Sequence, residues 1–244
     1  MQCLDLTLPT PAENLALDDA LLEEAEASGR PRETLRLWEP SGLVVVVGRS
    51  SRIDGEVRLE ACRRAGIPVL RRSSGGAAVV SGPGCLMYAL VLSLQLRPEL
   101  RAVRIAHRHV LTTLADALRP LVPGVRCRGT SDLAIGDAGS APERKFSGNS
   151  LRLKRDHLLY HGTLLYDFPL EWAERLLVMP PRQPDYRRGR PHGSFLGNLP
   201  VGAAAIRAAL RTAWDAGEPR AGWPRELTAR LAAERYARAE SYTR

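Results

Sequence analysis

Apolar and polar positions along the chain follow patterns that predict helices and strands in an irregular order. In residues 13–28, "ENLALDDALLEEAEAS", leucine and alanine recur at helical spacing, which predicts an amphipathic helix with an acidic outer face. Residues 42–48, "GLVVVVG", form a continuous β-branched run that is typical of a strand buried on both faces. The longest stretch with helical periodicity is 99–119, so the longest helix is expected there.

The other patterns predict shorter elements. Further strands are expected at 34–38, 67–72, 85–94, 131–136, 145–153 and 157–168. Further helices are expected at 55–66, 169–178, 201–215 and 225–240, with turns at the glycine-rich 72–84 and at 136–143. Because runs of strands occur without regular βαβ alternation, we expect an α+β (α/β) domain with a mixed, largely antiparallel sheet that helices cover on one side.

Composition does not change the expected fold class, but it restricts where the protein is expected to be located and how its cysteines are used. The 244 residues are 44% apolar and 25% charged, which is ordinary for a globular protein. The absence of a long apolar run and of a basic region followed by an apolar core predicts a cytoplasmic protein without a membrane partner. The four cysteines form no CxxC or Cys/His pattern, so buried thiols and no structural metal are expected. They are Cys3, Cys62, Cys85 and Cys127.

The net charge of +8 favours an acidic partner. Nucleic acid is the usual first interpretation of such a charge. However, aromatic residues make up only 5% of the chain, and the arginines are spread along it without interleaved aromatic residues. We therefore expect an acidic protein or a phosphorylated small molecule rather than nucleic acid.

One glycine-rich segment, "RRSSGGAA" at 71–78, has the composition of an anion-binding loop. Glycine permits close approach to a ligand and leaves amides unblocked, while arginine offers a planar fork for phosphate or carboxylate. A tight turn with solvated arginines is the equally open alternative. The segment is neither a Walker loop nor a dinucleotide fingerprint, because no GK[ST] follows and no helix begins there.

Both lysines of the chain, Lys145 and Lys154, lie in the segment "ERKFSGNSLRLK" at 143–154, whereas the other 33 basic residues are arginine. A lysine directs a compact ammonium at an oxyanion or a phosphate, where a forked guanidinium fits poorly. The retained lysines therefore indicate a chemical requirement, with chance survival as the alternative.

Two further side chains are candidates for chemistry. His161 in "YHGTLLY" is either a general base or, more often for such a residue, a structural histidine. Cys127 lies between Arg126 and Arg128, which would favour its thiolate if it is exposed. Spacing alone assigns no Ser-His-Asp or Cys-His-Asn set, so covalent catalysis stays open.

Taken in order, these segments resemble the lipoate-protein ligase A and octanoyltransferase family, which shares its catalytic fold with biotin protein ligases. After "ENLALDDALL", the stretch "RRSSGGAAVVSGPGCLMYAL" matches RRxSGGGAVxHxxGxLNxS, "SDLAIG" matches the NDL segment, "RKFSGNSLR" matches KxSGxAxR, and "HLLYHGTLLYDF" matches the HHGTLL segment. The resemblance covers about residues 10–180, and the ordered set is more specific than any single motif.

The resemblance implies a class II biotin/lipoate ligase-like catalytic domain at 1–215 and a C-terminal helical extension at 216–244 without a full accessory domain. A ligase of this family uses ATP and Mg²⁺, the metal held only through the nucleotide, to convert lipoate or octanoate to an acyl-adenylate. A lysine of a small, acidic lipoyl domain then takes the acyl group. The missing accessory domain implies an accessory ligase subunit as a further partner.

The same resemblance assigns the site. Lys145 contacts the acyl carbonyl and the phosphate and is the catalytic residue. The substrate and acyl-adenylate site is implied to comprise Arg72, Ser74, Gly75, Gly76, Ala77, Asp132, Gly148, Asn149, His161 and Gly162. Lys154 matches no family position and is expected on the surface of the turn that follows it.

The departures from the family pattern keep other functions open. Ala77 replaces the third loop glycine, Ser81 and Gly82 replace His-Asp, and "GTSD" at 129–132 replaces "GRND". An octanoyltransferase would use a cysteine nucleophile and acyl carrier protein without ATP, with Cys127 as the candidate. A third alternative is that the protein binds lipoyl or acyl-carrier domains without modifying them.

The segment at 180–199 matches none of the family motifs and is rich in arginine and proline. It could close over the nucleotide, dock the acceptor domain, or simply connect the core to the last helices.

Overall fold

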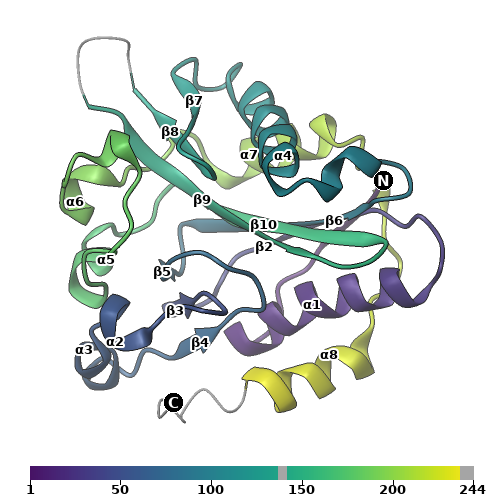
Figure 1. Ribbon diagram of the computed structural model, residues 1–244, viewed down its shortest axis with the longest axis horizontal. Coiled ribbons are helices and arrows are strands. Elements are labelled where there is room, and N and C mark those ends of the chain that lie inside the picture. The colour runs from purple at the N-terminus through teal and green to yellow at the C-terminus, as the bar shows by residue number, and fades with distance from the viewer. Residues whose placement is uncertain (137–141, 237–244) are drawn as a thin grey trace.

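The computed structural model describes residues 1–136 and 142–236, and two sheets organise them (Figure 1). The larger sheet has eight strands in the order β11-β1-β2-β6-β10-β9-β8-β7. These strands are β1 Gln2–Asp5, β2 Thr34–Trp38, β6 Cys85–Ser93, β7 Val125–Arg128, β8 Asp132–Ile135, β9 Arg144–Leu153, β10 His157–Leu165 and β11 Glu218–Pro219. Since β1 pairs in parallel with β2 and β11 while the other neighbours are antiparallel, the predicted mixed, largely antiparallel sheet is confirmed.

The smaller sheet has the order β4-β3-β5 and lies on the α1 side of the large sheet (Figure 1). Its strands are β3 Val44–Val47, β4 Val69–Arg71 and β5 Val79–Ser81. β5 lies inside the segment predicted as a glycine-rich turn, because Val79 and Val80 pair with valines of β3. The loop that remains between β4 and β5 is residues 72–78.

Helices cover both faces of the large sheet, so the prediction of cover on one side is wrong. Every residue of β2, β6 and β10 is buried, and a strand buried along its whole length needs packing on each face. Helix α1 (Pro11–Ala27) packs on these strands from one side, with α8 (Arg225–Leu231) beneath it. Helices α4 (Val103–Leu118) and α7 (Ala203–Ala213) cover the opposite face (Figure 1).

Helix α1 starts where the sequence chemistry favours a start. The Thr10 side chain accepts a hydrogen bond from the Glu13 amide, and the Glu13 carboxylate accepts one from the Thr10 amide, which forms a capping box. The predicted acidic outer face is wrong for Asp18 and Asp19, which are both buried. Asp18 is buried because it faces the sheet, where it pairs with Arg36 of β2. Asp19 is buried because the π-helical turn Ala232–Tyr236 covers it from the other side.

The helix predicted at 55–66 is two short helices, since Val57 is extended and forms a bridge to Leu177. The remaining short elements are α2 Ile53–Glu56, α3 Leu59–Arg64, α5 Glu171–Leu176, α6 His192–Phe195 and the 3-10 turns Pro98–Arg101 and Asp185–Arg187. Strands β1, β7 and β11 were not expected from the sequence, because none of them contains a run of apolar or β-branched residues.

Two predicted segments extend beyond the described part of the chain. Residues 137–141 of the turn at 136–143 lie outside the described residues, as does the last predicted helix after residue 236. Among the helices that are described, none has the length and apolarity needed to cross a membrane.

Candidate active site

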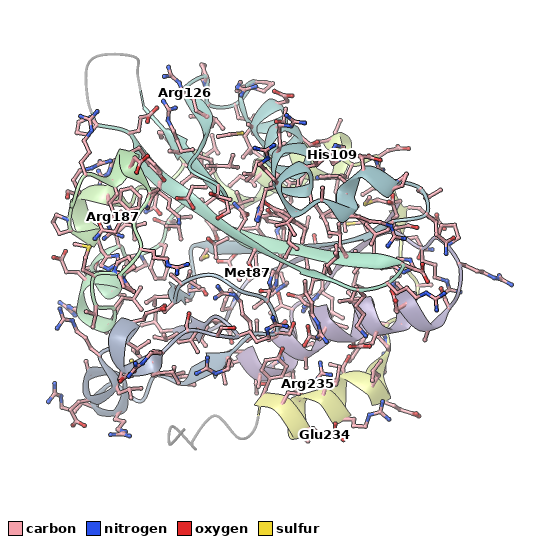
Figure 2. The ribbon with its side chains drawn as sticks, in the orientation of Figure 1. Met87, His109, Arg126, Arg187, Glu234 and Arg235 are labelled. Carbon is pink, nitrogen blue, oxygen red and sulfur yellow. The ribbon has the colours of Figure 1, made fainter. Side chains whose placement is uncertain are left out.

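A cavity of about 400 Å³ lies where the middle of the large sheet meets the loop 72–78. Its floor comes from β9 and β10, and its walls come from the loop, from residues 130–132 and from residues 182–184. It is lined by Leu15, Val46, Arg72, Gly76, Ala77, Ala78, Val79, Met87, Thr130, Ser131, Asp132, Lys145, Gly148, Asn149, Ser150, His161, Gly162, Thr163, Arg182, Gln183 and Pro184. Figure 2 shows Met87, one of these residues, near the centre of the molecule.

Lys145 reaches into this cavity through a β-bulge. The pairing of β8 with β9 shifts between Leu133 and Ala134, and this shift lets Lys145 and Gly148 line one cavity although they are three residues apart. A methyl group on Gly148 would lie 3.0 Å from Lys145 Nζ, so glycine leaves room for the lysine side chain to cross the strand.

A buried carboxylate holds the ammonium of Lys145. Asp132 Oδ1 is 2.7 Å from Lys145 Nζ, and Asp132 Oδ2 accepts a hydrogen bond of 2.9 Å from the Tyr186 hydroxyl. Burial and the neighbouring Asp132 charge raise the pKa of Tyr186, so its hydroxyl stays protonated and keeps donating. The three side chains form a fixed chain that ends at the cavity.

Arg72 shapes the loop 72–78 from within. Its guanidinium donates hydrogen bonds to the carbonyl groups of Val46, Gly75 and Ala77, and burial lowers its pKa to about 10, so it is still charged at neutral pH. Arg71 donates in the same way to Gly48 and Ser51. The two arginines that suggested an anion site therefore donate most of their hydrogen bonds to backbone carbonyl groups.

Gly76 is the loop residue that needs to be glycine. Its φ is +90°, and a Cβ there would lie 2.9 Å from Arg72 Nη2. Gly75 has open space around the same position, and it does not line the cavity. The two neighbouring glycines thus have different structural requirements.

His161 lies at the floor of the cavity between Ser74 and Asp18. Its Nε2 is 2.5 Å from Ser74 Oγ, and its Nδ1 is 3.9 Å from Asp18 Oδ2. The order Ser-His-Asp, which spacing could not assign, is present in space. However, Ser74 is only 2% exposed and does not line the cavity, and 3.9 Å is too long for a hydrogen bond. The set orients His161 and does not present Ser74 as a nucleophile.

Asn149 is fixed on three sides. Its Oδ1 accepts a hydrogen bond of 2.5 Å from the Tyr88 hydroxyl, and its Nδ2 donates to the carbonyl oxygen of Ser131 at 2.8 Å. Gly162 leaves the space that Oδ1 fills, because a Cβ there would lie 1.9 Å from it. Asn149 on β9 therefore links Tyr88 of β6 to the segment before Asp132.

A second, narrower cavity of about 110 Å³ adjoins the first. Its walls are mostly apolar and include Val80, Phe168, Leu177 and Phe195. Six residues line both cavities: Ala77, Ala78, Val79, Lys145, Gly148 and Thr163. The ammonium-bearing side chain of Lys145 consequently lies at the junction of a large polar space and a narrow apolar one.

An open groove of about 880 Å³ connects this site with the surface. It shares Gly76, Ala77 and Arg182 with the large cavity, and its outer part is lined by residues 50–56. A group that arrives from outside can approach the cavities along this groove.

The segment at 180–199 belongs to the site rather than to a simple connector. Arg182, Gln183 and Pro184 line the large cavity, whereas Arg187 and Phe195 line the narrow one. The guanidinium of Arg187, which Figure 2 labels, lies 4.6 Å from the centre of the Phe195 ring. No family motif covers these residues, so the length of the segment was the sequence feature that pointed to them.

Cys127 is not at the cavity. It lies on the edge strand β7, and Figure 2 shows its neighbour Arg126 at the outer edge of the molecule, away from Met87. Burial raises the pKa of the Cys127 thiol, the opposite of what its flanking arginines predicted. Arg126 and Arg128 both pair with Glu143 instead. The other three cysteines are buried, and none of the four lines either cavity.

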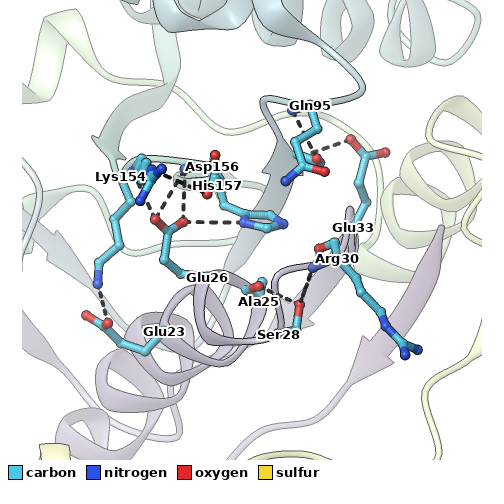
Figure 3. A network of polar contacts seen from close by, with 12 residues as sticks. Glu23, Ala25, Glu26, Ser28, Arg30, Glu33, Gln95, Lys154, Asp156 and His157 are labelled. Atoms are coloured by element: carbon cyan, nitrogen blue, oxygen red, sulfur yellow. Dashed lines mark hydrogen bonds and ion pairs between the residues drawn. The ribbon is translucent and has the colours of Figure 1, made fainter.

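Lys154 has a structural contact and is not free on the surface. Its ammonium pairs with Glu23 on α1, and its side chain is 23% exposed (Figure 3). Glu26, three residues after Glu23 on α1, accepts hydrogen bonds from the backbone amides of Arg155 and Asp156, which lie between β9 and β10. Lys154 thus helps to fasten the β9–β10 turn to α1.

The described residues contain no group of three or more His, Cys, Asp or Glu side chains that could hold a metal ion. Asp132 is the carboxylate that lines the large cavity, and both of its oxygens already have partners. A Mg²⁺ ion at this site would therefore depend on ligands from a nucleotide, as Mg²⁺ commonly does in proteins.

Nine of the eleven predicted site residues line the large cavity, and Ser74 and Gly75 do not. Sequence reasoning missed Asp18, which lies beside His161, and Asp19, which accepts a hydrogen bond from Ser73 in the loop. Asp18 and Asp19 follow the same helical pattern as solvated acids, so nothing in the sequence distinguished them.

The fold and the site together define an α+β domain with a cavity between a glycine-containing loop and a mixed sheet, into which one lysine reaches. The chain belongs to the lipoyl protein ligase A/B catalytic domain family, whose profile matches residues 10–199.

Curated relatives agree with this family. A protein of Aeropyrum pernix that carries the provisional name lipoate-protein ligase A is 31% identical over 176 residues, which cover 72% of this chain and 61% of that protein. The octanoyltransferase LipM of an Exiguobacterium species is 28% identical over 66% of this chain and 54% of its own length. The match spans about half the length of the first curated relatives, between 42% and 61%.

Solved structures share the fold. A bi-partite lipoate protein ligase from Thermoplasma acidophilum, described with its E2 lipoyl domain, has a TM-score of 0.74 at 22% identity and covers 96% of this chain and 90% of that chain. A lipoate-protein ligase A bound with ATP has a TM-score of 0.70 at 20% identity, over 96% of this chain and 92% of the other. The predicted ligase-like fold is thereby confirmed.

Proposed function

We propose that the protein activates lipoate or octanoate as an acyl-adenylate and transfers the acyl group to a lysine of a lipoyl domain. The observation that carries this proposal is the position of Lys145, which lines both cavities and is the lysine of the family's KxSGxAxR motif. Relatives named as ligases, and a structure of the same fold that holds ATP, support ATP as the co-substrate.

The two cavities suit the two halves of an acyl-adenylate. Part of the larger cavity is lined by the apolar residues Leu15, Val46 and Met87, which suits an eight-carbon chain. The narrow cavity has mostly apolar walls and a few polar groups, among them Glu56 and His192, which suits a purine base. Lys145 at the junction then lies beside the carboxylate and the α-phosphate.

The proposed reaction has two steps. A carboxylate oxygen attacks the α-phosphorus of ATP, and pyrophosphate leaves with the electron pair of the broken bond. The lysine amine of the acceptor then attacks the acyl carbonyl carbon and loses a proton, AMP leaves, and an amide forms. Lys145 stabilises the negative charge that develops in both steps, while Asp132 and Tyr186 hold it in position.

The position of Cys127 argues against the cysteine-dependent alternative. A thioester intermediate requires a thiol within reach of the acyl carbonyl, and no cysteine lines either cavity. The similarity to octanoyltransferases keeps this function worth testing, with octanoyl acyl carrier protein as the donor.

One assay distinguishes these functions. The protein is incubated with a lipoyl domain and either ATP, Mg²⁺ and lipoate or octanoyl acyl carrier protein, with and without added accessory subunit, and acylation is followed by intact mass. We expect acylation with ATP and lipoate, unchanged in Cys127→Ala. Acylation from the carrier protein alone, abolished in Cys127→Ala, would establish the transferase instead. Binding without acylation under either donor would establish a non-catalytic binder.

A further inference from the structure

Asp19 connects the glycine loop with the C-terminal part of the described chain. It lies on α1 and is 1% exposed. Its Oδ1 accepts a hydrogen bond of 2.5 Å from Ser73 Oγ, and Ser73 directly precedes Ser74 in the loop. Its Oδ2 accepts hydrogen bonds from the Tyr236 hydroxyl at 3.0 Å and from Arg235 Nη1 at 3.1 Å.

These contacts join segments that are far apart in the sequence. Tyr236 and Arg235 lie in the π-helical turn that follows α8, and Figure 2 labels Arg235 between α8 and α1. Tyr236 is 3% exposed, and burial together with the Asp19 charge raises its pKa, so the hydroxyl remains a donor. Arg152 on β9 approaches Asp19 Oδ1 to 3.5 Å from a third direction.

A buried carboxylate with this many donors has one well-determined orientation. Each donor lost leaves part of a buried negative charge uncompensated, and hydrogen bonds to charged groups are the strongest of their kind. Because Tyr236 and Arg235 occupy Oδ2, Oδ1 is presented to Ser73. The orientation of the Ser73 hydroxyl therefore depends on two side chains, those of Arg235 and Tyr236, that lie far from the loop in the sequence.

We propose that Tyr236, through Asp19, is a positioning residue for the substrate loop 72–78. Tyr236 and Asp19 together hold Ser73 in place. Through Ser73 they keep the neighbouring Ser74–His161 contact and the turn at Gly76 in the conformation that forms the cavity wall. The role of the loop in substrate binding rests on the proposed function, but the coupling of Tyr236 to the loop does not depend on catalysis.

The test is amide hydrogen exchange of residues 72–78 in the substrate-free protein, compared between wild type, Tyr236→Phe, Ser73→Ala and the double variant. Loss of one bond to a buried carboxylate is expected to accelerate loop exchange about 10-fold or more. Because the two substitutions interrupt one connection, the double variant should exchange no faster than the faster single variant.

Thr228→Val is the matched control. Thr228 is buried in α8 and donates only to the Pro224 carbonyl among its described hydrogen bonds, so its substitution weakens α8 without touching Asp19. Loop exchange should stay at the wild-type rate in this control. Equal acceleration in Thr228→Val and Tyr236→Phe, additive effects in the double variant, or unchanged exchange in Tyr236→Phe would each overturn the proposal.

If Tyr236→Phe does not fold, the test rests on Ser73→Ala. Loop exchange at the wild-type rate in Ser73→Ala would also contradict the proposed connection. Where the wild type is active, KM for the acyl substrate should rise about fivefold or more in Tyr236→Phe with kcat little changed, because positioning affects binding before chemistry. Inactivity of the wild type would count against the proposed function, while the exchange result would stand.

Discussion

At the scale of single residues, Gly76 and Gly75 are adjacent but have unequal roles. Gly76 combines a left-handed backbone with close approach to Arg72, whereas Gly75 has neither constraint. A side chain in the left-handed region costs about 1–2 kcal/mol, and at position 76 it would also displace the guanidinium that clamps the loop.

We therefore expect Gly76→Ala to lower kcat/KM about tenfold or more and Gly75→Ala to change it less than about threefold, since tenfold corresponds to about 1.4 kcal/mol. The measurement is steady-state acylation of a lipoyl domain by each variant. A Gly75→Ala variant as impaired as Gly76→Ala would show that the loop has a different conformation when it works.

The two lysines give a second prediction at this scale. Lys145→Arg should reduce acylation about 10²- to 10³-fold, because a forked guanidinium fits poorly beside Gly148 and one preorganised donor at a developing oxyanion is lost. Lys154→Arg should retain most activity, because an arginine can keep the ion pair with Glu23. Equal loss in both variants would remove the special role of Lys145.

At the scale of elements, α1 is the helix that brings buried carboxylates to the site. Asp18 accepts a hydrogen bond of 2.5 Å from the buried Arg36 and lies next to His161, while Asp19 holds the loop. The helix can carry these charges inward because each one meets a donor from another element. The position of the whole helix is set at its first turn by the capping box.

Thr10→Ala removes this cap and should destabilise the protein by about 1 kcal/mol, with a lowering of Tm of about 2–4 °C. Thr10→Ser keeps a hydroxyl that can accept the same hydrogen bond and should remain within about 1 °C of the wild type. The measurement is thermal unfolding of the three proteins in one buffer. Indistinguishable Tm values for Thr10→Ala and Thr10→Ser would show that the capping box contributes nothing.

At the scale of the whole molecule, the net charge of +8 would act on association with the proposed acceptor. If the partner is an acidic lipoyl domain, long-range attraction raises the association rate, and salt screens this attraction over a Debye length of about 10 Å at 0.1 M. The groove beside the site carries Arg52 and Arg182 at its rim, where an approaching acidic surface would meet them.

The association rate with a lipoyl domain should therefore fall about tenfold between about 0.02 M and about 0.3 M salt, with a smaller change in the dissociation rate. Stopped-flow or surface-based kinetics at several ionic strengths measure both rates. Association that does not depend on salt would contradict the electrostatic interpretation of the charge.

An element can be predicted from the sequence when its own residues carry an apolar periodicity or a β-branched run. Strands β2, β3, β6, β8, β9 and β10 and the long helices were predicted because apolar periodicity and β-branched runs are local properties. Strands β1, β7 and β11 were not predicted because none contains an apolar or β-branched run of its own, so each is defined by the partner with which it pairs. Helix cover on both faces likewise became visible only through the complete burial of the central strands.

By itself, the sequence determined the α+β class, the family and the identity of nine residues that line the large cavity, because the order of the motifs and the spacing of their glycines can be read from the sequence alone. The tertiary structure decided which charges are solvated and which are buried. It showed that Arg72, which lines the cavity, also holds the loop through its carbonyl groups. It also placed Cys127 on an edge strand away from the cavity and showed that Asp19 is buried. The physical reason is that the role of a polar group depends on its partners, and those partners come from distant parts of the chain.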